Sequence, residues 1–193
     1  MFLKTFCVTF VAGSLALAVS APADIVGFPE KNPVFTVEVP KDAKVKWEGD
    51  QLRIFPAKHQ GDVSFSALPD KVHDDASARA WLAEVLSIHT LNYSGLDRPP
   101  ALPVPEKRAP IGSGAHGFAA EGPAGNYVWI NKTNEQVQPE YYFEAVFTLD
   151  DKKYFSIHSD DNVQLETLLY GSNGQLEFYS ERNRIVDSIK PVK

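Results

Sequence analysis

Runs in which apolar and polar residues alternate occur along most of the chain, and this period of two predicts β-strands with one apolar face. In the run Tyr141–Leu149 every odd-numbered residue is apolar, so we expect those residues to face the core. Asp150–Lys153 follows as a predicted hairpin loop. The predicted strands are Phe35–Val39, Gln51–Phe55, Val63–Ala67, Phe118–Ala120, Tyr127–Ile130, Tyr141–Leu149 and Tyr154–His158.

Two longer segments have apolar residues at helical spacing instead. The first is Asp75–Leu91, and either Asp74 or Asp75 can cap its start. The second is Gly174–Ile189, which Pro191 ends because proline cannot continue a helix. We therefore predict one helix in the middle of the chain and one that closes it.

The remaining segments have less regular patterns. We expect Asp24–Pro33 to be an irregular lead-in, and we interpret Val163–Tyr170 as a short helix. The stretch 98–110 contains five prolines, which exclude a helix or a central strand. We predict an extended connection of the polyproline type there.

The order of these elements is strands, a helix, a proline-rich link, further strands and a closing helix. This order predicts an α+β fold, in which a twisted antiparallel β-sheet has helices packed on its faces. Such an arrangement buries the apolar face of each element.

The first 23 residues have the pattern of a cleavable secretory signal. Lys4 precedes an apolar run over residues 6–19, and Ala21-Pro22-Ala23 has the small-x-small pattern of a cleavage site. The apolar run is shorter than the roughly 20 residues of a membrane-spanning helix. We therefore expect cleavage after Ala23 and a periplasmic or secreted domain over residues 24–193.

Composition then restricts the functional classes. Cleavage would remove both Cys7 and Met1, the only cysteine and the only methionine, so a cysteine nucleophile or a zinc–thiolate site is excluded from residues 24–193. Cleavage would also remove Lys4 and change the net charge from -6 to -7. An acidic domain repels phosphate backbones, so we do not expect nucleic acid as a partner. No segment after residue 23 is apolar for long enough to span a membrane.

Two short motifs carry a resemblance to a known family. Phe35-Thr36-Val37-Glu38-Val39-Pro40 opens the domain, and Ile185-Val186-Asp187-Ser188-Ile189-Lys190 closes it. With the order of elements between them, the chain resembles the PsbP-like domain, which includes the extrinsic photosystem subunit and the periplasmic DcrB-like proteins. Two features depart from that family. Lys46-Trp47 stands where a glycine-tryptophan pair is usual, and the proline-rich link is longer.

The resemblance implies a PsbP-like sandwich and a mostly non-enzymatic family whose members bind, chaperone or stabilise other proteins. It has no shared catalytic residues to carry over. We therefore expect an accessory protein that docks to another envelope or secreted protein, in a chaperone, immunity or assembly role. We assign no catalytic residue, no metal ligand and no cofactor, and the sequence leaves open whether the protein is an enzyme.

The alternative function is a metal-dependent hydrolase or metal carrier. Two similar clusters, His73-Asp74-Asp75 and His158-Ser159-Asp160-Asp161, each have ligands suited to a hard or borderline metal ion. The other interpretation is that both clusters are caps or turns with solvated carboxylates. A shared site requires the two clusters to meet in space.

The glycine pattern Gly112-x-Gly114-x-x-Gly117 matches a dinucleotide fingerprint in spacing alone. A dinucleotide site needs a strand before the glycines and a helix after them, whereas Pro110 and Pro123 flank this segment. We therefore predict a turn. The sequons at Asn92 and Asn131 would matter only in a eukaryotic secretory pathway, which the sequence does not identify.

The aromatic residues of the later strands suggest a surface for protein binding. Tyr142 is out of phase with the odd-numbered core residues, so we expect its side chain to be exposed. Tyr127 and Trp129 share a face that alternation alone does not assign to the core or to solvent. These three residues form the predicted protein-binding surface.

Overall fold

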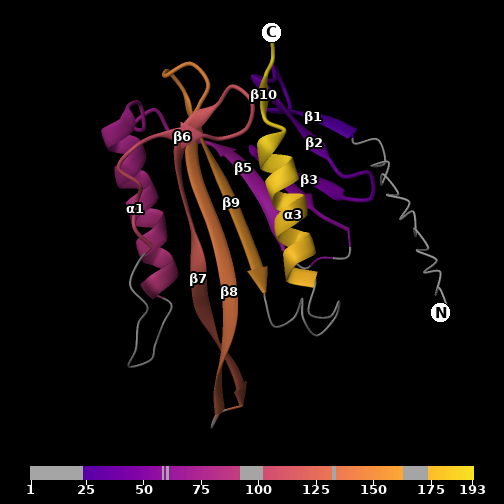
Figure 1. Cartoon of the computed structure of the whole chain (residues 1–193), viewed down its shortest axis with the longest axis vertical. Helices are drawn as coiled ribbons and strands as arrows, with labels where there is room; N and C mark the ends of the chain where they lie inside the picture. Colours follow the sequence, from indigo (N-terminus) through magenta and orange to yellow (C-terminus); the bar gives the residue numbers. More distant parts are fainter. Residues whose placement is uncertain (1–23, 58, 60, 92–101, 132–133, 163–173) are drawn as a thin grey trace, which may run out of the picture.

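The computed structural model describes residues 24–57, 59, 61–91, 102–131, 134–162 and 174–193, and it describes their side chains except at 88–91, 123–131, 134–141, 161–162 and 174–177. Figure 1 shows the arrangement of the elements. In chain order they are β1 (Asp24–Phe28), β2 (Phe35–Val39), β3 (Lys44–Glu48), β4 (Gln51–Phe55), β5 (Asp62–Ala67), α1 (Asp75–Leu91), β6 (Ala109–Pro110), β7 (His116–Asn131), β8 (Asn134–Thr148), β9 (Tyr154–Asn162), α3 (Gly174–Asp187) and β10 (Lys190–Pro191).

The strands form two antiparallel sheets. The large sheet has the order β3-β4-β5-β9-β8-β7-β6, and the small sheet has the order β1-β2-β10. In the large sheet, β5 pairs with β9 across almost a hundred residues, so the early strands and the later hairpins form one layer. The predicted α+β fold with an antiparallel sheet and helices on its faces is confirmed.

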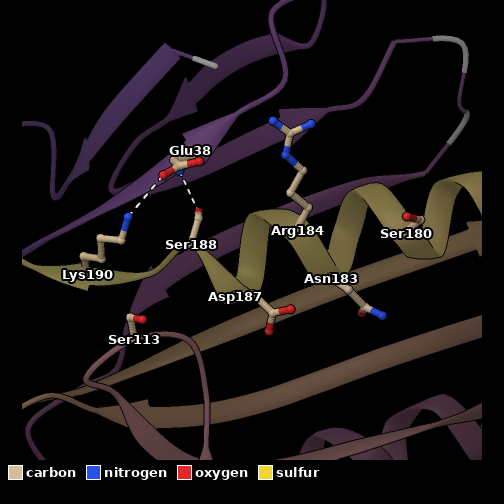
Figure 2. Close-up of a pocket in the computed structure, with 8 residues that line it drawn as sticks. All are labelled: Glu38, Ser113, Ser180, Asn183, Arg184, Asp187, Ser188 and Lys190. Atoms are coloured by element: carbon tan, nitrogen blue, oxygen red, sulfur yellow. Dashed lines mark hydrogen bonds and ion pairs between the residues drawn. The ribbon is translucent and has the colours of Figure 1, made fainter. Parts of the chain in front are cut away.

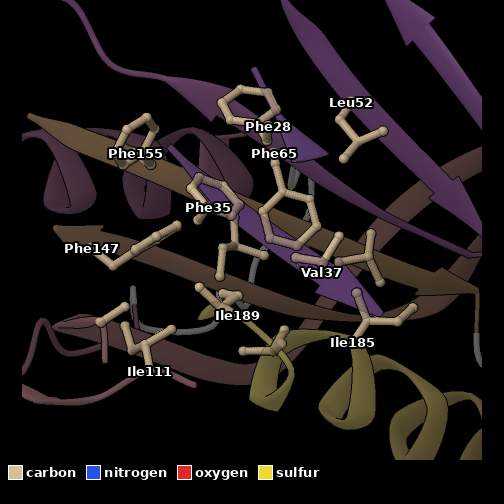
Figure 3. Close-up of a cluster of buried hydrophobic side chains, with 14 of the residues drawn as sticks. Phe28, Phe35, Val37, Leu52, Phe65, Ile111, Phe147, Phe155, Ile185 and Ile189 are labelled. Carbon is tan, nitrogen blue, oxygen red and sulfur yellow. The ribbon is translucent and has the colours of Figure 1, made fainter. Parts of the chain in front are cut away.

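The main apolar core lies between the two sheets (Figure 3). Phe35 of β2 is central, and its ring centroid lies 5.3–5.9 Å from those of Phe65, Phe147 and Phe155 on the large sheet. Helix α3 packs against β2 and contributes Ile185 to the same core. The small sheet and α3 together therefore cover one face of the large sheet.

Helix α1 covers part of the opposite face. Its residues Ala78, Leu82 and Leu86 pack on Phe118 of β7 and Val146 of β8 in a second buried cluster. In Figure 1, α1 and α3 accordingly stand on opposite sides of the large sheet. Within the described residues, no helix is long and apolar enough to cross a membrane.

A buried arginine attaches α3 to the long hairpin of β7 and β8. The Arg182 side chain donates to Glu121 of β7 at 2.7 Å, and its guanidinium lies 4.9 Å from the ring centroid of Phe143 and 5.1 Å from that of Tyr179. Only 1% of Arg182 is exposed. A charge buried to this degree requires an ionic partner, which Glu121 provides.

Several predicted elements are confirmed and others need correction. The bounds of β2, β4 and α1 agree with the prediction, and α3 ends two residues earlier than predicted, at Asp187. The segment Asp24–Phe28 was expected to be irregular but forms β1, which pairs with β2 along its whole length. Lys44–Glu48 was not predicted as a strand, although its polar and apolar residues alternate.

The later strands are longer than the sequence pattern indicated. The two predicted strands Phe118–Ala120 and Tyr127–Ile130 are parts of one strand, β7, because backbone pairing with β8 continues through Gly122 and Pro123. Of the proline-rich stretch, residues 102–108 form no helix or strand, and Ala109–Pro110 pairs with β7 as β6. The predicted signal segment, the predicted helix Val163–Tyr170 and the sequon at Asn92 lie outside the described residues.

Candidate functional site

An open groove runs between α3 and the small sheet (Figure 2). Its volume is about 590 Å³, and polar or charged side chains from four segments line it. The residues are Glu38 of β2, Ser113 of the loop before β7, Ser180, Asn183, Arg184 and Asp187 of α3, Ser188 just after it, and Lys190 of β10.

The opening and closing motifs of the chain meet in this groove. The buried Ser188 hydroxyl accepts a hydrogen bond from the Glu38 backbone N–H at 2.7 Å and donates to the Ile185 carbonyl at 2.6 Å. Ser188 thereby provides the acceptor that a longer β10 would otherwise supply to β2. The Lys190 ammonium lies 3.2 Å from the Glu38 carboxylate and completes this end of the groove.

The glycine-rich loop forms another part of the groove. Ser113 donates its backbone N–H to the Ile189 carbonyl at 2.9 Å, which fixes the loop against the end of α3. Gly112 has a φ of 70°, and a Cβ at this position would lie 2.7 Å from both Ile189 and Val186. Only glycine fits there. The predicted turn is confirmed, because β7 rather than a helix follows it.

The groove is suited to recognition of a polar surface. Its two carboxylates, from Glu38 and Asp187, and its two cations, from Arg184 and Lys190, can form ion pairs and hydrogen bonds with charged groups of a partner. Asp187 and Arg184 lie on the exposed side of α3. An open groove of mixed charge can contribute to specificity and to the rate of association with another protein.

A row of polar residues crosses the other face of the large sheet. Glu144 of β8, His158 of β9 and Ser64 of β5 lie directly opposite one another in the strand register. The Glu144 carboxylate, only 1% exposed, forms a hydrogen bond with Nδ1 of the His158 ring. Burial alone lowers the pKa of His158, but the hydrogen bond to Glu144 and the charges of Glu144, Asp160 and Asp62 outweigh it, so the pKa is raised.

A third polar cluster surrounds Arg108. This guanidinium forms ion pairs with Asp75 at the start of α1 and with Asp151 in the β8–β9 turn, and it donates to the Tyr154 hydroxyl at 3.0 Å. His116 lies 3.2 Å from the same Asp151 carboxylate. The hydrogen bond from Arg108, and then that from His116, lower the pKa of Asp151. The cluster fastens the end of the proline-rich link to both α1 and the sheet.

The structure does not bring the two His–Asp clusters together. Asp74 caps α1 by accepting the Ser77 backbone N–H at 2.8 Å. The Asp75 carboxylate lies beside the Tyr154 hydroxyl, and Tyr154 is four residues before His158 on β9, which corresponds to about 13 Å along a strand. Among the residues with described side chains, no three His, Asp or Glu residues gather as metal ligands would. The side chain of Asp161 lies outside that set.

The predicted aromatic surface needs correction at Tyr142. Its side chain is 5% exposed, because the even-numbered residues of β8 are buried as well as the odd-numbered ones. Its ring centroid lies 6.2 Å from that of His158, so Tyr142 belongs to the polar row. Tyr127 and Trp129 pair with Val137 and Glu135 through the backbone of β7, and their side chains lie outside the described set.

Sequence reasoning also missed the groove. Glu38 and Ser188 are separated by 150 positions, and no local pattern predicts that the opening strand and the segment after α3 share hydrogen bonds. The signal that does exist is the resemblance, because its two quoted motifs contain both residues. Glu38 and Ser188 of these motifs contact each other directly in the groove.

Comparison with known proteins supports the fold. No family model matches the sequence, and a search of curated proteins also finds no match. Among solved structures, the Ran-binding protein Mog1p of Saccharomyces cerevisiae is similar, with a TM-score of 0.50 and 11% identity over 89% of this chain and 97% of Mog1p. At this identity the likeness concerns the fold alone. The chain therefore has an α+β fold like that of Mog1p, and no family model supports the narrower PsbP-like or DcrB-like resemblance.

Proposed function

We propose that this chain is an exported, non-enzymatic accessory protein that docks to another protein of the cell envelope or the periplasm. Export rests on the signal pattern of residues 1–23. Protein binding is supported by the fold it shares with Mog1p, a protein described as Ran-binding. The likeness suggests a class of activity and does not identify Ran as the partner.

The observation that carries the proposal is the open, charged groove at the contact between β2 and the segment after α3. Small-molecule sites are usually enclosed and mostly apolar. This groove instead presents Glu38, Asp187, Arg184 and Lys190 around an open space of about 590 Å³. Its walls are fixed by hydrogen bonds within the protein, so the charges are already positioned before a partner arrives.

The test is recovery of a partner by the processed chain. Residues 24–193 are immobilised, exposed to envelope extract of the source organism and treated with a short cross-linker. We expect one protein to be enriched specifically, and we expect the double variant Arg184→Glu/Lys190→Glu to lose most of it. Lys71→Glu is the matched control, because Lys71 is exposed and lies near α1, away from the groove.

Two results would count against the proposal. One is recovery of no specific protein at all. The other is a partner whose recovery is unchanged in the groove variant, because that protein would bind elsewhere. Circular dichroism of each variant checks that the substitutions leave the fold intact.

A further inference from the structure

The described edges of the two sheets differ in how they are protected against pairing with another strand. Edge strand β3 carries outward charges at Lys44, Lys46 and Glu48, and β6 is two residues long and ends in Pro110. Charges, proline and short length are the usual means of blocking an exposed edge. On the small sheet, β10 is equally short and contains Pro191.

Strand β1 is less protected. It is five residues long, has no lysine, arginine or proline, and has one charged residue, Asp24, at its first position. Among the described residues it pairs only with β2. Its Ile25 is 71% exposed, the most exposed large apolar side chain among the described residues. An edge whose single charge lies at its first residue, and which has an exposed apolar side chain beside it, is a template for a further strand.

The hydrogen bonds of β2 show which backbone groups of β1 face outward. Glu38 of β2 donates its N–H to the Ser188 hydroxyl, on the side of β10. Because successive residues of a strand point these groups to opposite edges, the odd-numbered residues of β2 point toward β1. In the register, Ile25 lies opposite Glu38 and Gly27 opposite Thr36. The N–H and C=O of Ile25 and Gly27 therefore point away from β2, toward the free edge.

The position of β1 in the chain limits what can cover this edge. With cleavage after Ala23, β1 is the first segment of the processed protein, so no preceding residue of the chain is left to pair with it. A pairing of β1 with β1 of a second copy would by itself contribute five residues a side, whereas a stable interface uses about 20–30. A different protein can also occupy the adjoining groove, because Glu38 both lines the groove and lies opposite Ile25.

We propose that the free edge of β1 receives an extended segment of the partner protein as an added strand of the small sheet, with an apolar side chain of that segment against Ile25. This inference rests on the proposed docking function and names its surface. Backbone hydrogen bonds to Ile25 and Gly27 provide affinity in this mode, and alternate side chains of the partner provide specificity.

The experiment uses residues 24–193 and the synthetic peptide Lys-Val-Thr-Val-Thr-Val-Thr-Lys, followed by backbone amide shifts in NMR. The control peptide replaces the central Val-Thr pair with Pro-Pro, which cannot donate backbone hydrogen bonds.

Two variants of the protein distinguish binding through the backbone of Ile25 from binding through its side chain. Ile25→Pro removes one outward N–H and leaves the bonds between β1 and β2, and Ile25→Ala removes the side chain but keeps the N–H.

We expect the peptide to shift amides of β1 and its neighbours, with at least tenfold weaker binding to Ile25→Pro and a loss of only a few fold with Ile25→Ala. The inference is overturned if the peptide leaves β1 unperturbed at millimolar concentration, if both peptides bind equally, or if Ile25→Pro binds like the wild type. Concentration-dependent shifts of β1 without peptide would instead assign the edge to a second copy. If a recovered partner depends on the groove but is indifferent to Ile25→Pro, the docking function stands and this inference fails.

Discussion

The face of the large sheet that meets the small sheet differs in chemistry from the face on which α1 lies. On the first face, Phe147 and Phe155 pack against Phe35 in the apolar core. On the second, beyond the apolar cluster under α1, Tyr142 and Glu144 are also buried, and polar groups face one another across the strands. Burial of Phe147 and Phe155 depends on shape and apolar area, whereas burial of Glu144 depends on the pairing of polar groups.

This difference explains why Tyr142 was misplaced. Alternation identifies which residues share a face, but it identifies the exposed face only when one side of the sheet meets water. Here both sides of β8 are covered, so Glu144, a charged residue in the supposedly exposed phase, is buried as deeply as Ala145. The polar side chain of Glu144 therefore reflects its hydrogen bond with His158 on the neighbouring strand, and not exposure to solvent.

The largest expected effect is on the apolar face. Phe147 is fully buried, with its ring centroid 5.4 Å from that of Phe35. Phe147→Ala is expected to lower the free energy of unfolding by about 3–5 kcal/mol, because it removes buried area and leaves a cavity. Urea unfolding measures this, with Val192→Ala as the exposed control, which should stay within about 0.5 kcal/mol. A loss below about 1 kcal/mol would mean that this core is loosely packed.

A second substitution tests the corrected phase of β8. Tyr142→Ala is expected to cost about 3 kcal/mol, and Phe143→Ala about 2 kcal/mol, because Phe143 is only partly buried beneath Arg182. The two variants are compared by the same urea unfolding. If Tyr142→Ala is nearly neutral, the Tyr142 side chain is exposed. It could then belong to an aromatic binding surface.

The polar row should be sensitive to loss of one partner. Glu144→Ala is expected to cost about 2 kcal/mol, less than breaking a fully buried ion pair, because His158 is partly exposed. Glu144→Gln keeps a hydrogen-bond acceptor and should cost about 1 kcal/mol. If both variants lose the same free energy of unfolding, Glu144 stabilises the fold through packing and not through its contact with His158.

The same pair predicts a dependence of stability on pH. The pKa of His158 is higher in the folded protein than the value of 6.5 in the unfolded chain. Protonated His158 therefore contributes fully to the free energy of unfolding below pH 6.5, and this contribution is lost as the pH rises through the pKa of the folded state. The urea midpoint should therefore fall as the pH rises above 6.5. In His158→Gln this fall should be much smaller. An unchanged slope in the variant would assign the pH dependence to another group.

The smallest effect is expected at the exposed cluster around Arg108. Its side chain and those of Asp75 and Asp151 are all partly or largely solvent-accessible. Arg108→Ala should therefore cost only about 0.5–1 kcal/mol, and less in high salt, which screens exposed charges. A cost as large as that of Glu144→Ala would show that this cluster holds the proline-rich link more firmly than its exposure suggests.

Local sequence patterns predicted the elements whose apolar residues repeat over many positions. Helix α1 extends over Asp75–Leu91 as expected, and β2 has its predicted bounds. Strand β1 was missed because Gly27 interrupts a short pattern, and its pairing depends on β2, a separate segment. The alternation in Lys44–Glu48 did contain the signal for β3, together with the turn at Gly49 and Asp50.

The candidate site could not be predicted in the same way. The groove depends on contacts between residues about 150 positions apart, such as Glu38 with Ser188 and Lys190. The row of Glu144, His158 and Ser64 likewise needs the register of three strands. Each residue alone has an ordinary local explanation, and only the sheet order brings them together.

The hydrogen bond between Glu38 and Ser188 also bears on the order of folding. Strand β2 lies between β1, from the start of the described chain, and β10, near its end. During synthesis from the N-terminus, the ribosome produces β2 long before residues 185–190 exist to complete its core and its edge. Contacts of such high sequence separation form late and slow folding. A nascent chain of this topology therefore keeps the middle strand of the small sheet incomplete until synthesis is nearly finished.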